Sequence, residues 1–341
     1  MTKYRQRITC IFFLLIAAIT NPLQAAALFG TAFLSYNEQL IHNTREGNLD
    51  KIKWCIAKGA NVNYQDQYGD TPLHFSTKLG HLGIVKYLVE QGANVNQQNK
   101  SGYTPLHISA LNGHLSCIKY LIAQGSDIEY KRSIGETALI CSATNRHFDC
   151  LKYLVKKGAN FNAKDAYGYN SLTISVLRRS FDCVNFLLEQ GADPNYEWDS
   201  WFGESSTALN ESASRGYLEI VKCLVDHGAN INHQSKLGNT ALLLSAKKGD
   251  LPCIKYLVEQ GADINVKNKD DFTALLFSAE SGNLACVKYL VEQGANIHTK
   301  NKDGETALYL SAKHGKLDCV KYLEQQLYNG SVQSTVSTDW F

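Results

Sequence analysis

Cysteine and histidine are the residues of this chain with the widest chemical range, and there are ten of each. A thiolate can act as a nucleophile or bind a metal, and an imidazole can act as a general base or a ligand. The spacing argues against both uses. Six of the cysteines recur at one position of a repeated sequence, namely Cys117, Cys150, Cys183, Cys253, Cys286 and Cys319. Cys-x-x-Cys pairs and sets with the spacing of zinc ligands are absent from the sequence. We therefore expect small, buried thiols, and neither a metal site nor a cofactor.

A reactive thiol is the alternative, because this position falls in the first turn of a helix, where a thiol pKa can be lowered. Burial acts in the opposite direction, and an acid directly precedes three of these cysteines, at Asp149, Asp182 and Asp318. Equivalent positions of stacked repeats lie about 9–10 Å apart, which is beyond the reach of a disulfide. We therefore expect the thiols to be unpaired and inert.

The histidines also follow the repeat. His74 and His107 close the sequence Thr-Pro-Leu-His, and His81, His114 and His147 each follow the end of a first helix. We expect them to form hydrogen bonds between loops. A glycine-rich phosphate loop and a recognisable nucleophile motif are both absent from the sequence. Only about 36 N-terminal and 14 C-terminal residues lie outside the repeats, too few for a catalytic domain, so we expect no enzyme and no small-molecule substrate.

Two markers define the repeat. Threonine, or asparagine once, falls at Thr71, Thr104, Thr137, Asn170, Thr207, Thr240, Thr273 and Thr306. Glycine falls at Gly59, Gly92, Gly125, Gly158, Gly191, Gly228, Gly261 and Gly294. Both series advance by 33 residues, with one step of 37 that places a four-residue insertion between Gly191 and Thr207. A period of this length decides the architecture.

The repeat from Tyr68 to Lys100 predicts two short helices and a polar link. Thr71 suits an N-cap, Pro72 suits the first helical position, and Gly80 suits the left-handed end of the first helix. The second helix carries an apolar stripe of Ile84, Val85, Leu88 and Val89. Helices this short are marginal alone, so stacking on neighbours must stabilise them.

This unit resembles the ankyrin repeat. The matching residues are Gly69, Thr71, Pro72, Leu73, His74, Gly80, His81, Val85, Leu88, Gly92, Ala93 and Asn96. The resemblance covers roughly residues 37–327, although most repeats read Thr-Ala-Leu in place of Thr-Pro-Leu-His. It implies an all-α fold, an ankyrin-repeat solenoid of about nine helix-turn-helix units with β-turn fingers.

The expected organisation follows from this period. Residues 37–67 form an N-terminal capping repeat after a lead-in at 28–36, and residues 68–302 hold seven repeats with a long finger at 192–206. Residues 303–327 form a C-terminal capping repeat, and residues 328–341 form a flexible tail.

Residues 1–27 have the layout of an export signal. A basic head precedes an apolar run at residues 8–19, Pro22 ends it, and small residues permit cleavage after Ala25 or Ala27. The sequence therefore predicts an exported chain, secreted or periplasmic. An uncleaved membrane anchor and a buried helix remain open, and the membrane is a partner only if residues 8–19 stay uncleaved. Unpaired cysteines suit a reducing space instead. Either burial of the thiols or delivery by a bacterium into a host cytosol would reconcile the two.

The charge balance argues against nucleic acid as a partner. The formal charge is +2, and Lys3, Arg5 and Arg7 supply three positive charges in the first 27 residues, which contain no acid. The rest of the chain is therefore slightly acidic and has no basic excess to bind phosphates.

Two departures from the repeat stand out. Arg146 and Arg179 replace the glycine that ends a first helix, which indicates either drift or, together with Arg178, a contact surface. The inserted finger carries four aromatic residues, Tyr196, Trp198, Trp201 and Phe202. Either the longer loop buries them on its own helices, or they form an exposed patch for a partner. An exposed patch predicts that replacing Trp198, Trp201 and Phe202 by serine abolishes binding and leaves thermal unfolding nearly unchanged.

The resemblance implies a non-enzymatic scaffold for a protein partner, which binds through finger tips and the exposed side of helix one. Phe75 and Lys78 are among the variable positions of that surface. The residues that we expect to bind the partner are Tyr68, Asp70, Tyr103, Glu136, Tyr167, Tyr169, Tyr196, Trp198, Trp201, Phe202, Asn239, Phe272 and Glu305. Self-association through an end cap or the aromatic finger is the alternative.

Overall fold

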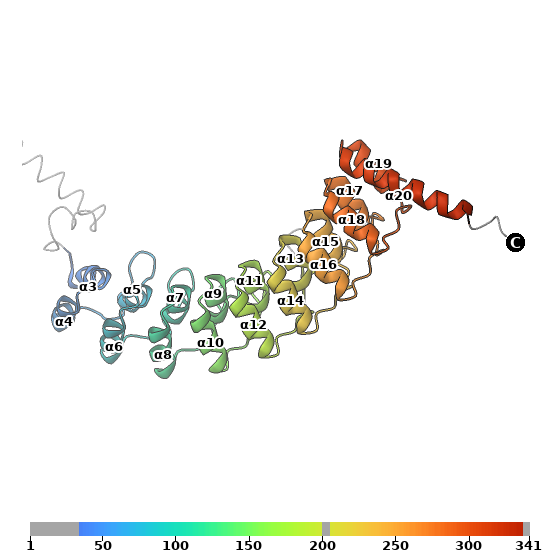
Figure 1. The fold of residues 1–341 in the computed structure, drawn as a ribbon. Helices are drawn as coiled ribbons and strands as arrows, with labels where there is room; N and C mark the ends of the chain where they lie inside the picture. The colour runs from blue at the N-terminus through green and yellow to red at the C-terminus, as the bar shows by residue number, and fades with distance from the viewer. Residues whose placement is uncertain (1–33, 200–204, 337–341) are drawn as a thin grey trace, which may run out of the picture. The chain divides into compact units, whose positions relative to one another are not determined.

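The computed structural model describes residues 34–199 and 205–336, and over these residues the chain forms nine helix–loop–helix pairs. The predicted export signal, Trp201 and Phe202 lie outside the described residues. The chain divides into two compact units, one up to Ala159 and one from Asn160. In each unit the first helices of the pairs lie in one row and the second helices in another (Figure 1).

The first unit holds four pairs. Its first helices are α3 (Tyr36–Arg45), α5 (Pro72–Leu79), α7 (Pro105–Leu111) and α9 (Ala138–Thr144). Its second helices are α4 (Leu49–Ala57), α6 (Leu82–Glu90), α8 (Leu115–Ala123) and α10 (Phe148–Lys156). Each first helix contacts its own second helix, and α3, α5 and α7 each contact the first helix of the next repeat, so the predicted stack is confirmed within this unit.

The second unit holds five pairs. Its first helices are α11 (Ser171–Leu177), α13 (Ala208–Arg215), α15 (Ala241–Lys248), α17 (Ala274–Ser281) and α19 (Ala307–Lys313). Its second helices are α12 (Phe181–Glu189), α14 (Leu218–Asp226), α16 (Leu251–Glu259), α18 (Leu284–Glu292) and α20 (Leu317–Val336).

The helix ends follow the local sequence as expected. Thr71 has extended backbone, its hydroxyl accepts from the His74 N–H, and Pro72 occupies the first helical position. Gly80 ends α5 in the left-handed conformation, at φ 72°. The apolar stripe of α6 is confirmed at Ile84, Val85 and Leu88, which are buried. Val89 was expected to be buried too, but it is half-buried because it lies in the last turn, next to exposed residues.

A series of asparagines joins the loops after the second helices. The Asn63 amide donates to the Gly92 carbonyl at 3.0 Å, and its carbonyl accepts from the Asn94 N–H at 2.8 Å. The same pair of bonds recurs one repeat later, from Asn96 to Gly125 and Asp127. Each loop therefore depends on the next one for its polar contacts, which is the reason single repeats cannot stand alone.

Within residues 34–199 and 205–336, three residues other than glycine have left-handed backbone. They are Arg146 at φ 61°, Arg179 at φ 54° and Asp271 at φ 61°. The structure therefore keeps the loop shape of the other repeats and does not adopt another one. Arg146 belongs to the first unit and Arg179 to the second, and both are exposed.

Arg146→Gly should stabilise the chain by roughly 0.5–1 kcal/mol, because glycine adopts positive φ without the steric cost of a side chain. Urea unfolding checks this. Asn145→Gly is the matched control. Asn145 has φ −104°, which any residue adopts, so a glycine there relieves no strain and should lower the free energy of unfolding or leave it unchanged. Equal effects of the two variants would contradict the explanation.

The inserted finger forms a short hairpin. Strand β1 (Glu197–Asp199) pairs antiparallel with β2 (Ser205–Thr207), with Trp198 opposite Ser206. The side chain of Trp198 is only 4% exposed. The expectation of an exposed aromatic patch is therefore wrong for Trp198, and the alternative that the longer loop buries its ring is correct.

The last helix is longer than expected. We placed a capping repeat up to residue 327 and a flexible tail from 328, but α20 continues to Val336. The segment between Leu317 and Asn329 contains neither glycine nor proline, so no residue in it ends the helix. Over the described ranges, helices that are long and apolar enough to cross a membrane were not found.

Candidate protein-binding surface

The predicted contact residues fall into two series with different exposure. The finger tips are exposed at Tyr68 (62%) and Tyr167 (46%), and the equivalent Leu237 is also exposed (44%). The second series precedes the helix-one N-cap of each repeat. It comprises Asp70, Tyr103, Glu136, Tyr169, Asn239, Phe272 and Glu305, all of which are half-buried. We expected both series to face a partner, and the second series is exposed only in part.

The second series is half-buried because it makes contacts inside the chain. Asp70 accepts from the Asn99 amide at 2.7 Å, and Glu136 binds the Arg132 guanidinium, which also lies 4.3 Å from the Tyr103 ring centre. These groups hold neighbouring fingers together. They are therefore available to a partner only in part.

In the second unit too, the residues of this series contact other residues of the chain. Asn239 accepts from the Asn268 amide at 3.0 Å, and the Phe272 ring stacks on Phe277 at 4.7 Å. Glu305 accepts from Lys313 at 2.7 Å and from the Asn301 amide, and these bonds lower the pKa of its carboxyl group.

A pocket of about 370 Å³ opens on the finger and helix-one side of the first unit. It brings together four residues that the sequence analysis named and two that it missed. Its lining residues are Arg45, Tyr68, Asp70, Phe75, Lys78 and Leu79. Leu79 is 41% exposed, so this pocket combines apolar walls with both signs of charge.

Arg45 organises the pocket. Its guanidinium lies 4.2 Å from the Phe75 ring centre and forms an ion pair with Asp66 at 3.0 Å. The Nε atom of Arg45 is buried and has no hydrogen-bond partner within the described residues. Arg45 was not among the expected contact residues because it lies in the degenerate first repeat, although it is 33 residues before Lys78 and so occupies the same position.

The aromatic cluster of the second unit is compact. Trp198 stacks on Tyr196 and meets Tyr169 edge-on, with ring centres 6.4 Å apart in both pairs. The Tyr196 hydroxyl donates to the Gly168 carbonyl at 2.7 Å, and Lys164 lies 4.4 Å from the Tyr196 ring centre. The cluster anchors the hairpin to the preceding finger, so Tyr167 at its edge is its main exposed ring.

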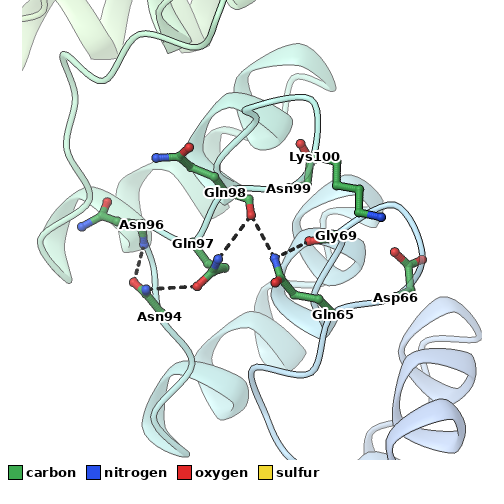
Figure 2. A pocket seen from close by; sticks show the side chains of 9 residues that line it. All are labelled: Gln65, Asp66, Gly69, Asn94, Asn96, Gln97, Gln98, Asn99 and Lys100. Carbon is green, nitrogen blue, oxygen red and sulfur yellow. Dashed lines mark hydrogen bonds between the residues drawn. The ribbon is translucent and has the colours of Figure 1, made fainter.

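A polar hollow of about 580 Å³ lies between successive fingers of the first unit (Figure 2). Gln65 donates to the carbonyls of Gly69 and Gln98, and Gln97 donates to the same Gln98 carbonyl. Its carboxamides thus connect the fingers to one another. A general acid and base in contact are not found among its lining residues.

Two buried histidines also bridge repeats, as expected. His74 Nε2 lies 3.0 Å from the Tyr103 carbonyl, and His107 Nε2 lies 3.2 Å from the Glu136 carbonyl. A carbonyl only accepts, so Nε2 carries the proton and Nδ1 accepts from a threonine hydroxyl, at 2.8 Å from Thr104. Burial lowers the pKa of His74, and it lowers the pKa of His107 to about 4.

The cysteines of the described ranges are all buried and unpaired, as expected. Burial raises the pKa of the thiols, to about 12 for Cys253, where Asp250 adds to the effect. Cys141 in α9, which the sequence analysis did not place in a series, has a pKa raised to about 12 by burial. Such thiols remain protonated and are poor nucleophiles. Groups of His, Cys, Asp and Glu that could hold a metal ion were not found in the described part of the chain.

The paired helices with β-turn loops define a helical repeat protein with a surface suited to binding. A family model that describes three consecutive ankyrin repeats matches four stretches of the chain, at residues 40–132, 127–197, 199–268 and 261–331. The chain therefore belongs to the ankyrin repeat family. A comparison with curated proteins finds no match. Ankyrin repeats are generally protein–protein interaction modules, and the family is typically non-enzymatic.

Proposed function

We propose that this protein is a scaffold that binds a partner protein through its finger tips and the exposed side of the first helices. The observation that carries the proposal is the pocket of about 370 Å³ in the first unit, where Tyr68 and Leu79 are exposed beside the charged side chains of Arg45 and Lys78. Exposed aromatic and aliphatic side chains beside an arginine are typical of the centres of protein interfaces. The partner segment should be apolar with an acidic residue.

The partner can be identified by placing a photo-reactive amino acid at position 68. The same amino acid at position 54 is the control, because Trp54 is also exposed (48%) but lies on a second helix, α4. A partner that is crosslinked from both positions would not use the finger surface.

Once the partner is known, Tyr68→Ser with Leu79→Ser should weaken its affinity about tenfold or more, because both side chains lose apolar contact area. Thermal unfolding should change little, since both side chains are exposed. Leu317→Ser is the matched control: Leu317 is 68% exposed at the start of α20 and should not affect binding. Unchanged affinity in the double variant would contradict the proposal.

We also propose that residues 1–27 direct export, on the basis of their sequence layout alone, and that the chain acts outside the compartment that makes it, as an exported effector would. The intact mass of the protein from its producing cell tests this. A mass that includes residues 1–27 would contradict cleavage and leave an uncleaved membrane anchor or a buried helix.

A further inference from the structure

The outer faces of the second helices carry opposite charge in the two units. In the first unit, α4, α6, α8 and α10 with their cap residues hold eight lysines and three carboxylates. The lysines are Lys51, Lys53, Lys58, Lys86, Lys119, Lys152, Lys156 and Lys157, and the acids are Asp50, Glu90 and Asp149. We call these residues the lysine face, and its formal charge is +5, eight minus three.

In the second unit the balance is reversed. The corresponding residues of α12, α14, α16 and α18, with the first eight of α20 and the cap residues, hold nine carboxylates and five lysines. The acids are Asp182, Glu189, Glu219, Asp226, Asp250, Glu259, Glu292, Asp318 and Glu324. We call this the carboxylate face, and its formal charge is −4, five minus nine.

The lysine face is not neutralised within its own unit. Seven of its lysines are exposed, and within the described residues these seven form no ion pair. Three ammonium groups lie instead over a tyrosine of the next repeat: Lys53 over Tyr87 at 5.8 Å, Lys86 over Tyr120 at 5.9 Å and Lys119 over Tyr153 at 5.6 Å. Contact with a ring restrains a lysine but leaves its charge in place. The result is a line of positive charges with one per repeat. Lys222, Lys255 and Lys288 occupy the same position in the second unit, and the two faces differ because carboxylates outnumber the lysines there.

The carboxylate face presents a line with the same spacing. Glu189, Asp226, Glu259 and Glu292 occupy equivalent positions at the ends of four successive second helices, and all four are exposed. Stacked helices lie about 10 Å apart, so the lysine and carboxylate lines have equal steps of about 10 Å. Two such lines can therefore oppose each other over several repeats.

We propose that the lysine face of one copy of this chain binds the carboxylate face of a second copy. Complementary charge and equal spacing fit these two faces to each other. A heterologous contact of this kind uses one face of each copy. Association should be sensitive to salt, since the charges are at the surface. The finger surface is not involved, so this proposal is independent of the proposed function.

Sedimentation of the full chain is the first test. Copies should associate at about 20 mM salt and separate at about 500 mM, where charges more than a few ångström apart are screened. The variant Lys119→Glu, Lys156→Glu, Lys157→Glu should weaken self-association about tenfold or more, and so should Glu189→Lys, Glu259→Lys, Glu292→Lys.

A mixture of these two variants tests whether the lysine face binds the carboxylate face. Each retains the face that the other has lost, so the mixture should form heterodimers that do not grow further, while neither variant associates alone. Lys222→Glu, Lys255→Glu, Lys288→Glu is the matched control, because it makes the same three changes on the carboxylate face and should not weaken association.

Three results would overturn the proposal. The first is a monomeric wild-type chain at low salt, and the second is a mixture without heterodimers although circular dichroism shows each variant folded. The third is a chain that stays monomeric but binds vesicles of anionic phospholipid through the three substituted lysines, because the occupant of the lysine face would then be a membrane.

Discussion

Trp198→Ala should destabilise the protein by about 3 kcal/mol, because truncating a buried tryptophan removes its apolar burial and leaves a cavity. The Trp198 ring is 4% exposed and contacts Tyr169 and Tyr196, so its loss also releases the hairpin of β1 and β2 from the preceding finger. Urea unfolding followed by circular dichroism measures the change.

Two controls accompany this variant. Tyr68→Ala removes a large aromatic ring that is 62% exposed, and it should change stability by no more than about 0.5 kcal/mol. Trp198→Phe should recover a large part of the loss because it restores ring contacts. If Trp198→Ala were as mild as Tyr68→Ala, the ring would contribute no packing, and the exposed-patch interpretation of the finger would return.

His107 should make the first unit sensitive to acid. The pKa of His107 is lowered from 6.5 to about 4, chiefly by burial, while the hydrogen bond to the Glu136 carbonyl acts in the opposite direction. The unfolded chain therefore binds a proton at a higher pH than the folded one. Stability from the neutral ring is complete above pH 6.5 and is lost as the pH falls from 6.5 towards 4, by about 3 kcal/mol in total. His74 shifts in the same direction and adds to the effect.

The measurement compares urea unfolding at pH 7.5 and pH 5 for the wild type and His107→Asn. Asparagine is a natural choice, since Asn210 occupies the same position in a later repeat and donates to the Asn239 carbonyl at 3.3 Å. Between these pH values the wild type should lose about 2 kcal/mol more than the variant. Equal losses would mean that the ring can be protonated in the folded state without cost.

Much of the fold could be predicted from the sequence because its causes are local. Thr71 and Pro72 begin a helix and Gly80 ends it through contacts within a few residues, and the 33-residue period repeats these signals along the chain. The periodicity also predicted correctly that Cys117 and its equivalents are buried.

The candidate site was predicted less well because exposure depends on distant residues. Asp70 is half-buried by Asn99, which lies 29 positions away, and Trp198 is buried by a finger of the preceding repeat. The end of α20 was misplaced for a different reason. The sequence after residue 327 no longer follows the repeat, and we interpreted this as a flexible tail although the helix continues to Val336.

Because of the hairpin that carries Trp198, the number of residues in the finger can change without a change in how the helices pack. Asp199 pairs with Ser205, so the two strands close before the five residues that connect them, and α13 starts directly after β2. Doubling the length of such a connection costs only about 0.6 kcal/mol. Residues can therefore be inserted between Asp199 and Ser205 while the helices on both sides keep their positions.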